Sequence, residues 1–288
     1  MELTGLLAYN ILVGIGTLVL ITIGLGVIFG MMKIINLAHG EFMMIGAYTV
    51  VLATGAGVNI WISMFLLAPL VSGLLGLITE RLLMRHLYGR MIDTMLATWG
   101  LSLLIIGAIT VIFGNQTRGI SSPVGNMSIG RFDVGLHGMV IVLTAIGALA
   151  AVACVLKFTK LGLIVRATMQ NSAMASALGV APKRVYMGTF ATGTALAGLA
   201  GGVLAPISGV APTMGAAYIA KAFITVLGGG PAIVTGTGLA STLFSPINEI
   251  VSFKATPIIG EVAMLVAAII IVRLLPQGIT GRFFRRSL

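Results

Sequence analysis

The stretch YNILVGIGTLVLITIGLGVIFG, residues 9–30, decides the class of this protein. No charged residue occurs between Glu2 and Lys33, and a membrane-spanning helix needs roughly 20 consecutive apolar residues. The rest of the 288-residue chain has the same character: 58% of its residues are hydrophobic and 8% are charged, whereas about 25% of residues are charged in soluble domains. Too few charges remain to cover a water-exposed surface, so we expect an integral membrane protein.

Seven further apolar segments follow, and together they predict an all-α membrane protein of about eight segments in a single domain, residues 1–288. One of them is interrupted by Gly228-Gly229-Gly230-Pro231. Gly and Pro both break helices, so we expect a broken or re-entrant pair of helices there. The seven segments are 40–53, 60–82, 94–113, 137–156, 185–205, 216–244 and 257–274.

Basic residues gather in three clusters between or after these segments. Cytoplasmic loops of membrane proteins are enriched in Lys and Arg. This rule places the clusters and the C-terminus inside, and the N-terminus and the loop Gly114–Gly135 outside. Counting the crossings then requires the chain to enter and return within 216–244. The clusters are Arg81, Arg85 and Arg90; Lys157, Lys160, Arg166, Lys183 and Arg184; and Arg273, Arg282, Arg285 and Arg286.

Three ionisable residues, Glu41, Lys221 and Glu261, lie within or beside apolar segments, where a charge is costly and usually functional. Residues 36–41 are either a helix start at the cytoplasmic interface, capped by Asn36, or part of a pathway or gate. Lys221 either reaches an interface or pairs with Glu41 or Glu261. Our candidates for a substrate pathway or gate are Asn36, His39, Glu41, Lys221, Gly228 and Gly229.

The longest predicted cytoplasmic connection, residues 157–184, contains an alanine-rich stretch that predicts a short helix over Arg166–Val180. Gly179 and Pro182 supply a stop for this helix. The helix is either a solvated connector or a docking element for a soluble partner. The residues that we assign to docking are Arg166, Gln170, Asn171, Ala173, Ala177 and Gly179.

Several kinds of chemistry are disfavoured by the sequence. No stretch has the form GxxxxGK[ST], so the chain cannot form a P-loop. The single cysteine, Cys154, excludes an internal disulfide, and His39-Gly40-Glu41 lacks the spacing of a zinc site. We therefore expect no catalytic residue, no metal site and no cofactor in this chain. Energy, if it is used, comes from a partner or an ion gradient.

Several sequence blocks resemble the branched-chain amino-acid ABC transporter permease family (LivH-type), which includes urea and short-chain amide permeases. The most specific block is INLAHGEFMMIGAY, residues 35–48. Residues 85–90 and 97–100 are similar to the urea and amide branch, whereas Lys221-Ala222-Phe223 is closer to the amino-acid branch, so the solute stays open. The other matching blocks are 96–103, 195–202, 226–229 and 275–278.

The resemblance implies a multi-pass permease subunit of an ATP-driven importer in the bacterial inner membrane. Such an importer moves a small nitrogenous solute (an amino acid, urea or a short-chain amide) into the cytoplasm. The implied partners are a second related permease, two cytoplasmic ATPases that bind the ATP, a periplasmic or lipid-anchored solute-binding protein, and membrane lipid, but no nucleic acid. The connection 157–184 is then expected to dock on the ATPase. The alternative is a stand-alone secondary transporter or channel for a small polar solute.

Overall fold

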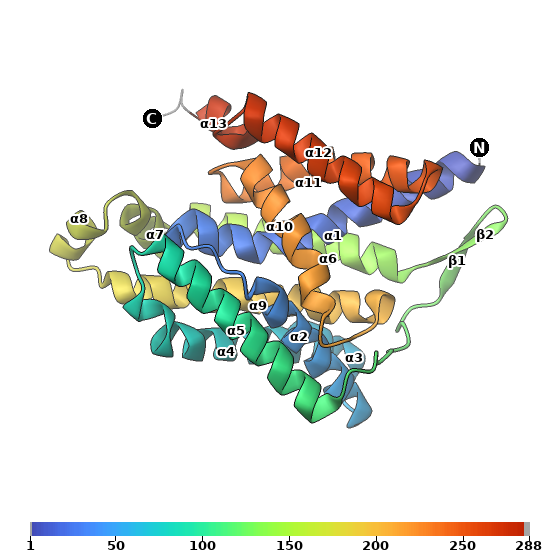
Figure 1. Cartoon of the computed structure of the whole chain (residues 1–288), viewed down its shortest axis with the longest axis horizontal. Helices are drawn as coiled ribbons and strands as arrows, with labels where there is room; N and C mark the ends of the chain where they lie inside the picture. Colours follow the sequence, from blue (N-terminus) through green and yellow to red (C-terminus); the bar gives the residue numbers. More distant parts are fainter. Residues whose placement is uncertain (1, 285–288) are drawn as a thin grey trace.

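The computed structural model describes residues 2–284, and nearly all of this chain is helical (Figure 1). The first half contains α1 (Glu2–Met32), α2 (His39–Gly55), α3 (Ile60–Ile62), α4 (Ala68–Leu82), α5 (Met91–Phe113) and the strands β1 (Asn126–Ile129) and β2 (Phe132–Gly135). The second half contains α6 (His137–Phe158), α7 (Lys160–Gln170), α8 (Ser172–Ala177), α9 (Pro182–Ser208), α10 (Met214–Gly229), α11 (Ile233–Lys254), α12 (Pro257–Leu274) and α13 (Gly278–Phe284).

The all-α membrane architecture is confirmed, and each predicted apolar segment corresponds to a helix or a helix pair. Within residues 2–284, six helices are long and apolar enough to cross a membrane. One of them runs from Ile60 to His86 and includes a π-helical turn over Ser63–Leu67. The remaining segments are α2, which has 17 residues, and the pair formed by α10 and α11, which is bent by 114°.

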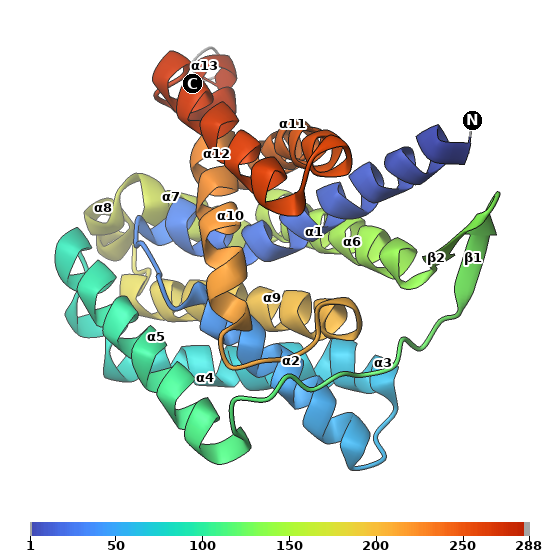
Figure 2. The same cartoon turned by 45° about the vertical axis from the view of Figure 1, so that its right-hand side comes forward.

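The two ends of the bundle differ in composition. Figure 1 shows the N-terminus and the β-hairpin at one end, and α7, α8 and α13 at the other. The start of α5, which follows Arg85 and Arg90, lies near α8 in both views (Figure 2). The predicted basic clusters therefore share one end, except that Arg285 and Arg286 lie outside the described residues. This arrangement agrees with the predicted orientation.

The centre of the bundle is formed by α1, α2, α4 and α9, which touch through glycines. A Cβ atom on Gly201 would lie 1.8 Å from the Met43 carbonyl oxygen of α2, and one on Gly46 would lie 2.2 Å from the Gly198 carbonyl oxygen of α9. Helices in lipid associate by such close backbone packing, because lipid provides no hydrophobic drive between them. The small residues of α9 thus serve packing within the chain.

The bend between α10 and α11 confirms the break predicted from the glycine run. Gly230 has a φ of +84°, a conformation that glycine adopts without strain. A Cβ atom there would lie 2.6 Å from the carbonyl oxygen of Gln277, which directly precedes α13. The chain therefore reverses level with the end of α12, and α11 returns towards the end that holds the N-terminus (Figure 1).

The loop Gly114–Gly135, which the sequence indicated only as polar and mixed, contains a β-hairpin. Its strands pair antiparallel, with Asn126 opposite Gly135 and Ile129 opposite Phe132. The Tyr9 hydroxyl of α1 donates to the Gly135 carbonyl oxygen at 2.5 Å, which ties the hairpin to the first helix. The hairpin thus lies beside the start of α1 (Figure 2).

Candidate functional site

The first candidate site is a break between α1 and α2 that lies deep inside the bundle. After Met32 the chain runs back along α1 without helical structure, and α2 begins at His39. The His39 Nε2 atom lies 3.0 Å from the Ile21 carbonyl oxygen. Ile21 precedes the end of α1 by eleven residues, which is about 16 Å along the helix axis. Helix α2 therefore starts well inside the bundle and not at its cytoplasmic surface.

This position corrects the expectation of a capped helix start at the interface. Asn36 and His39 are fully buried, and Glu41 is 3% exposed. The residue before α2 is Ala38, and no side chain caps the helix. Asn36 Oδ1 instead accepts a hydrogen bond of 3.1 Å from the Ala38 backbone N–H, so that it stabilises the turn before the helix. The segment 33–38 is held by interior contacts that the sequence does not reveal.

Helix α5 supplies a polar stripe that supports this segment. Its buried residues are Thr94, Thr98 and Ser102, which are four apart and share one face. Thr98 Oγ1 accepts a hydrogen bond from the Leu37 N–H at 3.1 Å. Ser102 interacts with the Glu41 carboxylate. Backbone freed from helix inside a membrane needs such partners. Sequence reasoning missed this stripe, although three hydroxyls at helical spacing in an apolar segment were its signal.

Several polar atoms of this cluster have no hydrogen-bond partner among the described residues. They are Asn36 Nδ2, His39 Nδ1 and Glu41 Oε2. A buried unsatisfied group costs about 1–3 kcal/mol, so such a cluster persists where it has a task or where water or a solute completes it. The structure thus buries the predicted residues Asn36, His39 and Glu41 in neighbouring positions, with the His39 side chain directed at Ile21 of α1 and the Glu41 side chain at Ser102 of α5.

Lys221 and the predicted glycines lie elsewhere. The Lys221 Nζ atom is 2.6 Å from Glu261 Oε1 of α12, so Glu261 is its partner and Glu41 is not. Gly228 and Gly229 sit in the last turn of α10. A Cβ atom on Gly229 would lie 2.6 Å from the Gly236 carbonyl oxygen. These glycines let α10 and α11 touch, and they line neither pocket described below.

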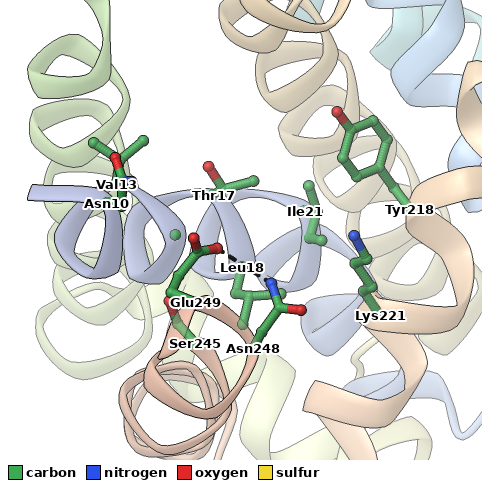
Figure 3. Close-up of a pocket in the computed structure, with 11 residues that line it drawn as sticks. Asn10, Val13, Thr17, Leu18, Ile21, Tyr218, Lys221, Ser245, Asn248 and Glu249 are labelled. Atoms are coloured by element: carbon green, nitrogen blue, oxygen red, sulfur yellow. Dashed lines mark hydrogen bonds between the residues drawn. The ribbon is translucent and has the colours of Figure 1, made fainter. Parts of the chain in front are cut away.

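Lys221 lines a polar pocket of about 220 Å³ between α1, α10 and α11 (Figure 3). Polar side chains on all three helices contribute to it, and α11 provides a carboxylate, an amide and a hydroxyl. The polar residues that line the pocket are Asn10, Thr17, Tyr218, Lys221, Ser245, Asn248 and Glu249. Sequence reasoning did not identify Glu249 or Asn248, because both lie between the predicted apolar segments 216–244 and 257–274, where polar residues are expected.

The predicted single docking helix over Arg166–Val180 is wrong, because two helices occupy this region. Helix α7 ends at Gln170, and the Asn171 side chain caps α8 by accepting a hydrogen bond of 2.9 Å from the Met174 N–H. Asparagine is a strong N-cap residue and therefore starts a new helix here. Gly179, at a φ of +87°, follows the end of α8 as expected.

Helix α8 presents a small, partly apolar surface at the basic end of the bundle. Ala175 is buried, whereas Ala173 and Ala177 are exposed. The large side chains of Met174 and Leu178 are exposed as well. Arg166, Gln170 and Asn171 are also exposed, so the predicted docking residues lie on one accessible element pair. A short, exposed and partly apolar helix such as α8 is suited to insertion into a groove on a partner.

A second pocket, of about 340 Å³, connects this element pair with the start of the buried break. It is lined by the end of α1, by Lys33, which follows that helix, and by residues 168–172 at the junction of α7 and α8. Tyr186 of α9 closes it, and its ring packs against Tyr88 with the ring centroids 5.0 Å apart. Burial and a hydrogen bond to Glu80 raise the pKa of Tyr88 above its ordinary value, so the phenol stays a donor to that buried carboxylate.

Comparison with known proteins identifies the family. Residues 7–275 match the model of the branched-chain amino acid transport system / permease component family. The chain belongs to this family. It is 26% identical over 282 residues, 92% of each chain, to the high-affinity branched-chain amino acid transport system permease protein LivH of Escherichia coli. It is 25% identical to the probable LivH of Methanocaldococcus jannaschii over 92% of this chain and 88% of that protein. BraD of Pseudomonas aeruginosa is 26% identical over 92% of each chain.

Family membership makes this chain a multi-pass permease subunit of an ABC transporter and not an enzyme. No solved structure gives a significant match. Within residues 2–284, no group of three or more His, Cys, Asp or Glu side chains is arranged to hold a metal ion.

Proposed function

We propose that this chain is a membrane subunit of an importer that moves amino acids across the inner membrane into the cytoplasm, with ATP bound and hydrolysed by separate subunits. The observation that carries the proposal is the pocket between α8 and the end of α1. It connects an exposed docking element with Lys33, the exposed first residue of the segment that leads to the buried residues Asn36 and His39. The names of the relatives, which are branched-chain amino acid permeases, support the choice of solute class.

The coupling follows a short path through the chain. When an ATPase bound to α8 moves, it shifts α7 as well, and α7 contacts α1. The segment 33–38 begins there and ends at the buried cluster of Asn36, His39 and Glu41. Because this segment is not helical, its backbone angles are free to change without breaking a helix. A shift of α8 therefore reaches polar groups in the middle of the bundle and opens or closes the pathway.

The assembly that this mechanism requires is a second related permease, two ATPases and an external solute-binding protein. The basic end of the bundle faces the cytoplasm and the ATPases, and the β-hairpin end faces the binding protein. Outer helix surfaces suit lipid or the second permease, since Leu104, Val111 and Ile258 of α5 and α12 are exposed and apolar.

Two substitutions test the docking of α8. Ala173→Glu and Ala177→Glu each place a charge on the exposed face of this helix, and we expect both to reduce ATPase co-purification and uptake by at least about tenfold. Ala56→Glu, at an exposed position directly after α2 and outside the α7–α8 pair, is the matched control. Normal assembly and uptake in both α8 variants would mean that docking lies elsewhere, for example at residues 81–90.

Uptake by the reconstituted assembly tests the solute class. Isotopically labelled leucine, urea and acetamide are offered separately in proteoliposomes that contain ATP. We expect ATP-dependent accumulation of leucine and none of urea or acetamide. Accumulation of urea without leucine would assign the chain to the urea and amide branch and would refute the proposed solute class.

A further inference from the structure

The polar pocket between α1, α10 and α11 contains groups of both charges. Lys221 of α10 and Glu249 of α11 both line it. Figure 3 shows Asn248 between these two side chains in the view. Asn248 Nδ2 donates to Glu249 Oε1 at 3.2 Å, whereas its Oδ1 atom is buried and has no hydrogen-bond partner among the described residues. The pocket is thus lined by a cation and an anion, and an unsatisfied acceptor lies buried beside them.

Helix packing alone does not explain why the ionisable residues Glu249 and Glu261 lie where they do. Glu249 lies five residues before the end of α11, and Glu261 is the fifth residue of α12. Both helix ends lie at the end of the bundle that holds the N-terminus, which is the predicted outer side (Figure 1). Ionisable groups in a membrane face water-filled cavities or mark solute pathways, because lipid does not solvate them. The pocket therefore has the position of an entry chamber for solute arriving from outside.

The dimensions and chemistry of the pocket fit a small zwitterion. Its volume of about 220 Å³ lies below the range of roughly 300–1,000 Å³ that is typical of pockets for drug-sized ligands. Val13, Leu18 and Ile21 of α1 add an apolar wall beside the charged groups. An amino acid carries an ammonium and a carboxylate on one carbon and a side chain that prefers an apolar surface.

We propose that this pocket binds an amino-acid zwitterion, with the ammonium at Glu249 and Asn248 Oδ1 and the carboxylate at Lys221. The proposal rests on the proposed function, which it deepens by assigning binding residues. An ammonium donor satisfies the free Oδ1 atom of Asn248 and pairs with the Glu249 carboxylate. An apolar side chain lies against the α1 wall. Urea and amides lack both charges and leave Lys221 and Glu249 without ligand partners.

The ion pair with Glu261 gives Lys221 a partner when the pocket is empty. The Glu261 side chain is 53% exposed and that of Lys221 is 23% exposed, so this pair lies at the rim of the pocket. A ligand carboxylate joins or replaces Glu261 at the ammonium group. This exchange keeps Lys221 paired in both states and avoids leaving a charge without a partner.

The test measures whether an amino acid protects the pocket from a thiol reagent. In the assembled complex that carries Cys154→Ala, Thr17→Cys places a reporter in the pocket, and Ser128→Cys in the exposed hairpin is the control reporter. We expect leucine to slow methanethiosulfonate labelling at Thr17→Cys by about tenfold and to leave Ser128→Cys unchanged. Leucinamide, which lacks the carboxylate, and 4-methylpentanoate, which lacks the ammonium, should not protect.

Substitutions of the proposed binding residues, made in the Thr17→Cys reporter protein, identify the groups that bind the ligand. Glu249→Gln and Lys221→Met should each abolish protection by leucine, whereas the matched controls Asp133→Asn and Lys254→Met should retain it. Equal protection by leucinamide, unchanged protection in both pocket variants, or no labelling without leucine would each overturn the proposal. A complex that imports leucine and fails these tests refutes only this site. A complex that imports urea and not leucine refutes the proposed function.

Discussion

The two breaks in the helices of this protein have opposite construction. At the break between α10 and α11, backbone touches backbone, since Gly229 and Gly236 leave no room for a Cβ atom. At the break between α1 and α2, the segment 33–38 is held by hydrogen bonds to Thr98 and ends at buried polar atoms without partners. The first kind of contact resists movement, and the second permits it. We therefore interpret the α10–α11 break as a rigid elbow and the α1–α2 break as the moving element.

The largest expected effect is a loss of folding stability on substitution at the rigid elbow between α10 and α11. Gly229→Leu forces a side chain into the Gly236 backbone, and we expect loss of about 3 kcal/mol or more of stability and little folded protein. Gly238→Leu, at a position of α11 with open space around its Cβ, is the matched control and should fold normally. Thermal unfolding and yield in detergent measure both. A Gly229→Leu protein as stable as the wild type would show that the elbow is not tightly packed.

The second-largest expected effect is on uptake, when Glu41 near the start of α2 is replaced. Glu41→Met removes a buried carboxylate that has an unpartnered oxygen, so folding stability should stay the same or rise by about 1–3 kcal/mol. We expect uptake to fall by at least about tenfold, because the cluster no longer responds to solute or water. Glu2→Met, at the exposed start of α1, is the control. An unfolded Glu41→Met protein would instead assign the carboxylate a structural role.

The smallest effect concerns the backbone at the start of the moving segment. Lys33 has a φ of +53°, and no other non-glycine residue of the described chain has a positive φ. Such a conformation costs about 1–3 kcal/mol outside glycine, so Lys33→Gly should raise stability by about 1 kcal/mol, whereas Lys33→Val should lower it. Thermal unfolding of the two variants gives the comparison. A destabilised Lys33→Gly protein would show that the lysine side chain contributes more than the strain costs.

The elbow was predictable from the sequence and the moving segment was not. Three glycines followed by Pro231 signal a bend wherever they occur. Residues 33–38, KIINLA, contain neither Gly nor Pro. Their non-helical structure depends on Thr98, which is more than sixty residues further along the chain. Local sequence carries no information about such a partner, so the sequence left open whether residues 36–41 are a helix start at the interface or part of a pathway or gate.

The candidate site residues also divide into those that the sequence reveals and those that only the tertiary structure reveals. Asn36, His39 and Glu41 were found because polar residues near an apolar segment are conspicuous, and their burial together agrees with a shared role. The partners of Lys221 in the pocket, Asn248 and Glu249, come from a different helix and required the tertiary structure. The sequence assigned Asn171 to the interior of a single alanine-rich helix, whereas the structure shows it as the N-cap of α8.

Two matched cross-links test the central claim most directly. One cross-link joins Leu37 of the moving segment to Thr98 of α5, and the other joins Ala232 of the elbow to Thr280 of α13; in each pair a backbone N–H donates to a threonine hydroxyl, at 3.1 Å and 3.4 Å. Both residues of a pair are changed to cysteine in Cys154→Ala protein, and uptake is measured in the assembled complex before and after oxidation and again after reduction. We predict that the Leu37→Cys/Thr98→Cys cross-link abolishes uptake reversibly and that the Ala232→Cys/Thr280→Cys cross-link leaves it intact. Full uptake with the first cross-link closed, or its loss only with the second, would contradict the account.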